Sequence, residues 1–239
     1  MIPLIVLSVA LLMIGVEVVG GKRKWPQVRG WWARALLLNL VQFGIAYLAA
    51  SLWDPTMAPL RPWSADALGN AWGAVLGYFV ITFFYYWWHR WRHEFSFLWR
   101  WFHQVHHSPQ RIEIITSFYK HPFEIFVNSV MSSAILYFVV GLNPLAGAYA
   151  FLLTGLAELF YHWNIATPYW LGFIIQRPES HCVHHKAGYH TNNFADLPLW
   201  DMMFGTFENP RVWDADCGFG KTGELELWKM LKGRERPNS

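Results

Sequence analysis

Long apolar stretches dominate the first 163 residues of the chain. The stretches 35–53 and 67–88 contain no charged residue, and 2–21 contains one. Each is close to the ~20 residues that an α-helix needs to cross hydrocarbon. A longer apolar region, 123–163, is interrupted by GLNPLAG, which predicts a helical hairpin of two spans or a re-entrant pair. The pattern predicts an all-α integral membrane protein with about four to five transmembrane or re-entrant helices.

Composition agrees with this class, because 54% of the residues are hydrophobic and 15% are charged. The first stretch has no basic residue before its apolar core, and GKRK follows it. A cleaved signal peptide has the opposite order, so we expect 2–21 to be a retained helix. The two cysteines, Cys182 and Cys217, give no disulfide framework, and we expect them to be reduced.

Basic residues predict the orientation of these helices, because Lys and Arg are enriched in cytoplasmic loops. The segments 21–34 and 89–121 are rich in both, whereas 54–66 holds one Arg against two Asp, and the hairpin tip is uncharged. This distribution predicts an outside N-terminus, with 21–34, 89–121 and 163–239 in the cytoplasm. The net charge of +3 then reflects membrane topology, and we expect no nucleic-acid partner.

All eleven histidines lie between positions 89 and 190, at or beyond the predicted cytoplasmic ends of helices. Eight of them form three groups with helical spacing. Positions i, i+3 and i+4 share a face of an α-helix. We therefore expect each group to point its imidazoles at one place, the groups being His89 and His93, then His103, His106 and His107, and then His181, His184 and His185.

These groups favour a metal site with more than one ion. Imidazole nitrogen is a common ligand of iron, zinc, copper and nickel. Eight such ligands exceed what one tetrahedral ion uses, so we expect two ions with about four or five ligands each. His162 and His121 are candidates to complete the set. His162 directly follows an apolar span, where an ionisable group is costly and usually functional.

Other polar residues near these groups are candidate additional ligands or hydrogen-bond partners of the ligating rings. Each also has a structural explanation, as a surface, interfacial or packing residue. They are His121, Glu158, Glu94, His190, Asn193 and Asp196.

Six motifs together resemble the fatty acid hydroxylase/sterol desaturase superfamily, and they occur in the order found there. The resemblance covers about 70–210 and is strongest to the bacterial sterol-desaturase-like and alkylglycerol-monooxygenase-like branch. The motifs are HRWRHE (89–94), HQVHH (103–107), KHPFE (120–124), YHWN (161–164), HCVHH (181–185) and LWDMMFGTF (199–207).

The resemblance implies a membrane di-iron enzyme that uses O₂ to hydroxylate or desaturate a lipid. It implies that the eight grouped histidines and His162 bind two iron ions, with zinc as a substitute in purified protein. Some relatives have an HxxxH pair where this chain reads ELFYH, so Glu158 stands in place of a histidine. The implied organisation is 1–66 as N-terminal transmembrane helices, 67–210 as a catalytic domain with a cytoplasmic helical cap, and 211–239 as a C-terminal cytoplasmic tail.

Breaking an unactivated C–H bond requires a redox metal, because side-chain acid/base chemistry does not suffice. The sequence has no flavin, haem or ferredoxin motif, so we expect a separate electron-donor protein at the basic cytoplasmic face. We expect the lipid to enter from the bilayer through an apolar tunnel between the helices. The candidate donor-binding residues are Arg90, Arg92, Arg100 and Lys186, and the pattern favours their alternative roles as topology signals or contacts of lipid head groups.

Two other functions use metal-binding histidines. A zinc-dependent membrane hydrolase needs a metal-bound water and a carboxylate base, but the chain has no HExxH motif and has an excess of histidines. A metal transporter or sensor needs ionisable residues along a path through the spans, and the first three apolar stretches hold only Glu17. Both alternatives therefore explain the pattern less well than an oxygenase.

Overall fold

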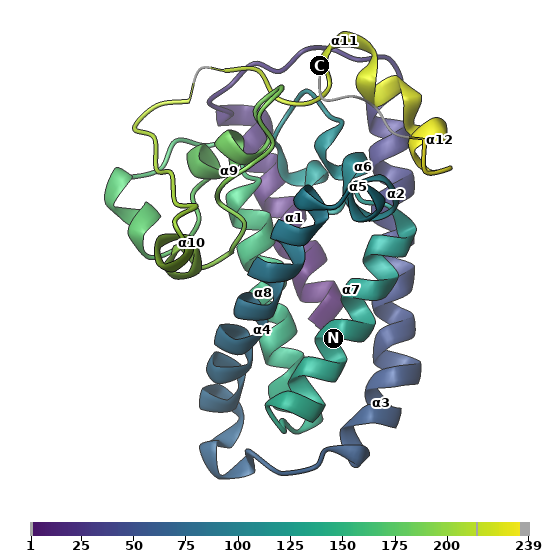
Figure 1. Cartoon of the computed structure of the whole chain (residues 1–239), viewed down its shortest axis with the longest axis vertical. Helices are drawn as coiled ribbons and strands as arrows, with labels where there is room; N and C mark the ends of the chain where they lie inside the picture. The colour runs from purple at the N-terminus through teal and green to yellow at the C-terminus, as the bar shows by residue number, and fades with distance from the viewer. Residues whose placement is uncertain (1, 214, 235–239) are drawn as a thin grey trace.

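Four apolar helical segments run side by side along the long axis of the molecule (Figure 1). The computed structural model describes residues 2–213 and 215–234, and over these residues it is helical with no strand. The predicted all-α membrane architecture is confirmed. The segments that are long and apolar enough to cross a membrane are Trp31–Leu60, Asp66–Glu94, Pro122–Val139 and Pro144–Tyr161.

Several of these spans are composite, because α-helix gives way to a π-helical or 3₁₀ turn within them. The first joins α2 (Trp31–Leu48), η1 (Ala49–Trp53), α3 (Asp54–Met57) and η2 (Ala58–Leu60). The second joins η3 (Asp66–Leu68) and α4 (Gly69–Glu94). The predicted hairpin consists of α7 (Pro122–Ala134) with η6 (Ile135–Val139), followed by α8 (Pro144–Tyr161).

The GLNPLAG interruption forms the turn of this hairpin. Gly141 has a φ of 76°, a left-handed conformation that glycine adopts without steric cost. The Asn143 side chain caps α8 by accepting hydrogen bonds from the backbone N–H groups of Leu145 and Ala146. Pro144 occupies the first helical position, where its missing N–H is not needed. Local sequence therefore reverses the chain at this end of the bundle.

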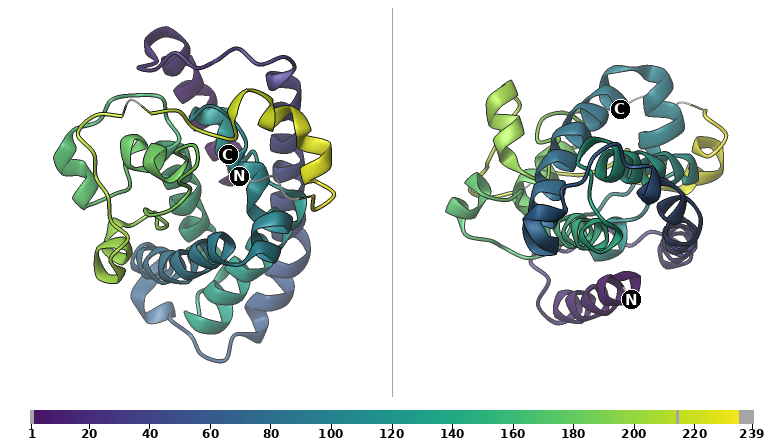
Figure 2. Two further views of the ribbon diagram at one scale, coloured as in Figure 1. Left: turned by 45° about the horizontal axis from the view of Figure 1, so that its top comes forward. Right: turned by 90° about the horizontal axis from the view of Figure 1, so that it is seen from below.

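The predicted first helix is present as α1 (Ile2–Gly20), but its apolar stretch is shorter than those of the four spans. The N-terminus lies partway along the bundle (Figure 1), and α1 stands at the edge of the bundle when the molecule is seen end on (Figure 2, right). Glu17 joins α1 to the rest of the chain, because its carboxylate accepts hydrogen bonds from the backbone N–H groups of Ile114 and Asn164.

The segments between and after the spans fold into a cap at one end of the bundle (Figure 1). Its elements are α5 (Ser96–Leu98), η4 (Trp99–His103), α6 (Gln104–His107), η5 (Ile114–Thr116), η7 (Tyr169–Phe173), α9 (Pro178–His184), α10 (Pro198–Phe204), α11 (Gly220–Gly223), η8 (Glu224–Glu226) and α12 (Leu227–Met230).

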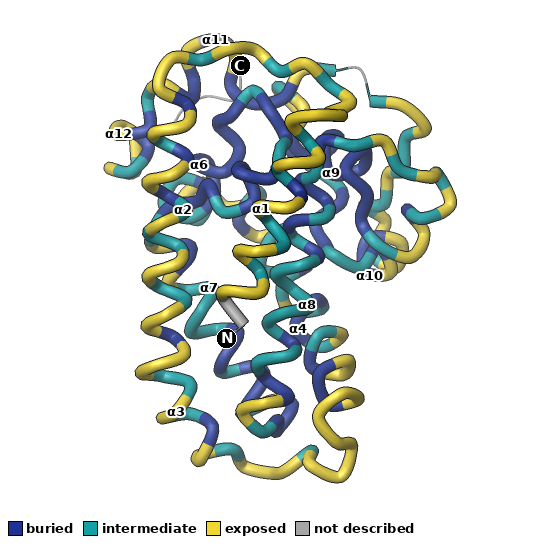
Figure 3. Tube along the Cα trace, turned by 180° about the vertical axis from the view of Figure 1, so that it is seen from behind, coloured by how far each residue is buried: buried dark blue, intermediate teal, exposed yellow. Residues whose placement is uncertain are grey.

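Burial is concentrated in the cap, whereas the outer faces of the bundle are exposed (Figure 3). Large apolar side chains such as Leu40 and Trp72 face outward on the spans, as expected for surfaces in contact with lipid. The C-terminal segment contributes Phe219 and Met230 to the core of the cap. The predicted C-terminal tail therefore packs onto the cap over its described part, and 235–239 lie outside the described residues.

Candidate metal centre

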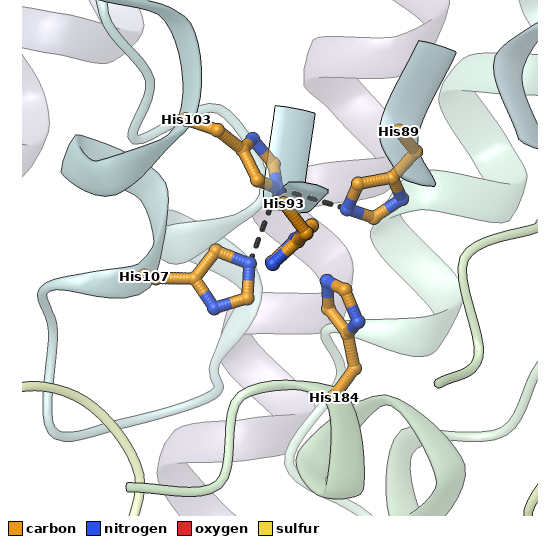
Figure 4. A group of neighbouring side chains, drawn as sticks. All are labelled: His89, His93, His103, His107 and His184. Atoms are coloured by element: carbon orange, nitrogen blue, oxygen red, sulfur yellow. Dashed lines mark hydrogen bonds between the residues drawn. The ribbon is translucent and has the colours of Figure 1, made fainter. Parts of the chain in front are cut away.

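Nine histidines converge at the junction between the bundle and the cap. They form two clusters, and within each cluster one nitrogen per ring lies within 4.8 Å of the others. The first cluster, shown in Figure 4, contains His89, His93, His103, His107 and His184. The second contains His106, His162, His181 and His185.

The expectation that each sequence group points at one place is wrong for the two triplets. His103 and His107 belong to the first cluster and His106 to the second. The other triplet divides in the same way, with His184 in the first cluster and His181 and His185 in the second. The reason lies in helix geometry: successive residues are rotated by about 100°, so positions i and i+4 differ by about 40° while i+3 and i+4 diverge by about 100°.

The local backbone brings the first triplet to the junction. A break at Phe95, which is extended, ends α4 after His93. The following helical turns include the π-helix η4, which ends at His103, and π-helical turns occur frequently at functional sites. On the opposite side, the seven-residue helix α9 begins at Pro178 and carries His181 and His184, and His185 directly follows it. Both triplets thus lie on or beside short helices.

A hydrogen bond fixes the tautomer of His89 in the first cluster. Its Nδ1 atom lies 2.7 Å from the Phe194 carbonyl oxygen, which requires a proton on Nδ1 and leaves a lone pair on Nε2. His103 Nδ1 lies 3.1 Å from both Glu124 Oε1 and the Arg92 guanidinium. The Nε2 atoms of His89 and His103 face each other at 2.8 Å, close enough for one metal ion to bind both.

Two further rings of the first cluster, those of His184 and His93, also have a nitrogen that is free to bind a metal ion. His184 Nδ1 lies 2.7 Å from the Asn192 carbonyl oxygen, which leaves its Nε2 atom as an acceptor. The Nε2 atoms of His184 and His93 are buried without a hydrogen-bond partner. Imidazole binds transition metals at about 2.1 Å, so donors on opposite sides of an ion stand about 4 Å apart. The spread of the cluster accommodates such an ion.

The second cluster has the same features. His162 Nδ1 lies 2.8 Å from the Glu158 carbonyl oxygen, and its Nε2 atom lies 3.1 Å from His181 Nε2. Both ring nitrogens of His185 are buried without a partner. The rings of His107 and His185 stack with centroids 4.0 Å apart, so the two clusters are in direct contact. Two ions bound here would be close neighbours.

Burial keeps these imidazoles neutral. Removal from water, reinforced by neighbouring histidines, lowers the pKa of His107 and of His185 well below its usual value. Burial likewise lowers the pKa of His184 to about 3. A neutral ring offers a lone pair, which is the form that binds a metal. The clusters can therefore accept cations at neutral pH without first losing protons.

A cavity of about 890 Å³ leads from the clusters into the bundle. It is lined by parts of α1, α2, α4, α7 and α8, and it reaches His89, His103, His106 and His181. A smaller cavity of about 370 Å³ reaches His93 from the cap side and is lined by Arg90, Trp99 and His190. The clusters are thus approached from within the bundle and, separately, from the cap.

Residues 74–206 match the fatty acid hydroxylase family, which is more than half of the chain. The chain belongs to this family. The match confirms the resemblance seen in the histidine motifs, and the matched region includes all nine clustered histidines. No solved structure matches the chain.

Three relatives in this family illustrate the range of similarity. Alkylglycerol monooxygenase of Danio rerio is 30% identical over 75% of this chain and 39% of its own length. Ornithine lipid hydroxylase OlsE of Rhizobium tropici is 31% identical over 74% of this chain and 54% of its own length. Sphingolipid C4-hydroxylase sur2 of Schizosaccharomyces pombe is 27% identical over 65% of this chain and 55% of its own length. The chain therefore spans about half or less of the length of these three relatives.

The structure places the other predicted site residues of this fatty acid hydroxylase family member outside the clusters. His190 lies nearest, with its Nδ1 atom 2.9 Å from His107 Nδ1. Asn193 holds the loop after α9, because its amide group bonds to the backbone of Ser180 and Glu208. Asp196 lines the larger cavity.

The three remaining candidates have structural partners. His121 accepts a hydrogen bond from the Phe123 backbone N–H and so caps α7. The carboxylate of Glu158 pairs with Lys120, while its backbone carbonyl orients His162. Glu94 is exposed and pairs with Arg90 on the same helix.

Glu124, to which the sequence assigned no role, is fully buried beside the first cluster and contacts His103. Its partner is Arg92, which was expected at the basic surface but is buried and ion-paired with Glu124. The signal was present in the KHPFE motif, because a carboxylate in the first turn of an apolar span is costly without a partner. The two cysteines are free and buried, as expected.

Proposed function

We propose that the chain is a membrane-bound, O₂-dependent di-iron oxygenase that hydroxylates or desaturates a C–H bond of a lipid. The main support is the convergence of nine buried imidazoles into two adjacent cages at the end of a cavity within the bundle. The relatives are named as lipid hydroxylases and monooxygenases, which agrees with a lipid substrate from the bilayer.

In this proposal, five histidines hold one iron ion and four hold the other. Bound iron would supply the redox chemistry with O₂ that side chains lack. The protein would fix the rings through the carbonyl groups of Phe194, Asn192 and Glu158, because such outer partners set ring orientation and tautomer. Zinc suits the same donors and is the competing ion in purified protein.

The cavity would hold the lipid chain and keep water from the reacting carbon. Electrons would come from a separate donor protein at the cap, where the smaller cavity reaches His93 and is lined by the ion pair of Arg90 and Glu94. We further propose that the cap faces the cytoplasm, as the placement of Lys and Arg predicts.

The two rival functions fit the site less well. A zinc hydrolase needs one ion with an open position and a carboxylate base, whereas the described residues form two cages of four and five imidazoles. A transporter needs ionisable groups along the bilayer path, whereas both cages lie at one end of the bundle.

Metal analysis combined with an O₂-uptake assay tests the proposal. The full chain, purified in detergent and loaded with ferrous iron, should contain about two iron ions and consume O₂ only when lipid and a reductant are supplied. One zinc ion per chain, with no O₂ uptake after iron loading, would contradict it.

A further inference from the structure

The larger cavity has a polar end and an apolar end. Along α8 it extends from Pro144 to Tyr161, which corresponds to about 25 Å at 1.5 Å per residue. The middle of its wall is formed by apolar side chains such as Phe43, Ala46 and Phe151. At the histidine end, charged side chains from four separate segments line the wall, namely Arg92, Lys120, Glu124, Glu158 and Asp196.

Four of these five charges are paired with each other. Arg92 pairs with Glu124, and Lys120 pairs with Glu158. Asp196 has no ion pair with any Lys or Arg among the described residues, and its neighbour is the Tyr161 hydroxyl. Among the described residues, Asp196 is therefore the carboxylate at the histidine end that has no ion pair of its own, because the nearby Lys120 is paired with Glu158.

This carboxylate lies beside the second histidine cluster. The Tyr161 ring, whose hydroxyl meets Asp196, stands 4.5 Å from the His181 ring and 4.9 Å from the His162 ring. Removal from water and the nearby Glu158 carboxylate raise the pKa of Asp196 to about 7. The side chain is half-buried and lines the cavity, so a hydrogen-bond donor of a ligand there can reach it. A hydrogen bond to a charged carboxylate is stronger than one between neutral groups.

We propose that Asp196, together with Tyr161, binds a hydrogen-bond-donating head group of the lipid, such as a hydroxyl or an ammonium, and disfavours lipids that end in a carboxylate. This inference rests on the proposed function and names the substrate class of the same site. The head group lies next to the second cluster, and the chain extends through the apolar section toward Pro144. A lipid carboxylate in this position would face Asp196 with the same charge, and this repulsion lowers its affinity relative to the amine and the alcohol even beside bound iron.

Binding of three lipids with the same chain tests the inference without turnover. Stearylamine, stearyl alcohol and stearic acid compete with a fluorescent alkyl-chain probe for the iron-loaded full chain in detergent, at about pH 8, where Asp196 is ionised. We expect the amine and the alcohol to bind about tenfold more tightly than the acid, because hydrogen bonds to a charged group are strong. Equal binding of all three would overturn the proposal.

Asp196→Asn keeps the shape of the side chain and removes its charge. In this variant the preference over stearic acid should shrink to about twofold or less. Tyr161→Phe removes only the hydroxyl and should narrow the preference without abolishing it. Iron content and the thermal unfolding midpoint identify variants that retain the fold. Full retention of the preference in Asp196→Asn would contradict the assignment.

Asp54→Asn is the matched control, because Asp54 lines the same cavity, hydrogen-bonds to Ser133 and lies on α3 at the end away from the cap. This change should leave the preference among the three lipids as in the unmodified chain. If it abolishes the preference instead, the head group binds at the far end and the proposal is wrong.

O₂ uptake measured on the same samples separates this inference from the proposed function. Lipid preference without lipid-dependent O₂ uptake would count against the oxygenase and leave the binding role of Asp196 intact. Lipid-dependent O₂ uptake without a preference among the three lipids would support the oxygenase and contradict the binding role of Asp196.

Discussion

Two pairs of adjacent histidines contribute to different cages. His107 and His184 belong to the first cluster, whereas their neighbours His106 and His185 belong to the second. Because neighbouring side chains on a helix diverge by about 100°, one turn can serve two ions at once. Substitution of a single histidine should therefore affect mainly one of the two proposed ions.

Adjacent substitutions on α9 test this division. We expect His184→Asn and His185→Asn each to lower the iron content from about two ions to about one and to reduce lipid-dependent O₂ uptake ~100-fold or more. Spectroscopy of the remaining iron should differ between the two variants, because each retains a different cage. His121→Asn is the control, since asparagine preserves the helix cap and His121 belongs to neither cluster. A loss of iron in the control equal to that in the variants would contradict the assignment.

The sequence was sufficient to predict which histidines converge but not how they divide. Spacing places i, i+3 and i+4 on one broad face, and the rotation of about 100° between i+3 and i+4 separates those two rings only because a cage lies on each side of the helix. The positions of the cages depend on tertiary packing, which the spacing does not show. The sequence pattern also could not predict which backbone carbonyl groups orient the rings. The role of Phe194 toward His89 comes from its backbone, and a side-chain pattern carries no information about that contact.

At the scale of elements, α9 is a short helix held by one buried side chain. Arg177 precedes it and is 1% exposed. Its guanidinium donates to Thr167, to Asn209 and to the Pro210 carbonyl, and it pairs with Glu179 in the first turn of α9. A helix of seven residues is unstable alone, so these contacts rather than helix propensity fix the position of its histidines.

Arg177→Met should therefore destabilise the cap. The change leaves Glu179 buried without its cation, which costs about 3–5 kcal/mol when one partner of a buried pair is removed. We expect a lower midpoint of thermal unfolding and weaker iron retention, measured by circular dichroism and metal analysis. Arg211→Met is the control, because Arg211 is exposed and stacks on Tyr169, and its loss should cost less than about 1 kcal/mol. Equal stability of the two variants would exclude the proposed role of Arg177.

The elements themselves follow closely from the sequence. The uncharged stretches became helices, and the hairpin turn lies at the predicted GLNPLAG interruption. The short elements of the cap were not predicted individually. They consist of turns with few residues, such as α9 and α10, and their positions depend on tertiary contacts like those of Arg177 and Asp201, whose carboxylate accepts hydrogen bonds from the loop after α9.

At the scale of the whole molecule, a long bundle carries a cap at one end and a cavity between its helices. The cavity lies between the helices, where an apolar tunnel was predicted, and entry of the lipid from the bilayer stays a prediction. Orientation in the membrane remains a prediction from charge, because the arrangement of helices is the same whichever side the cap faces.

Single cysteines placed at the two ends of the bundle test the orientation. We expect Leu60→Cys and Asn143→Cys to react with a membrane-impermeant thiol reagent added outside cells, and Leu225→Cys to react only after permeabilisation. The native Cys182 and Cys217 are buried and provide a low background. Labelling of Leu225→Cys alone in intact cells would show that the cap lies outside.

Both cages take histidines from the same two short segments, 103–107 and 181–185. In the proposed function, an ion bound by His103, His107 and His184 would immobilise both short helices, which also carry or adjoin His106, His181 and His185. The other cage would then lose less conformational entropy when it binds its own ion. Each ion should accordingly bind more tightly when the other cage is already filled than when that cage has been removed by substitution.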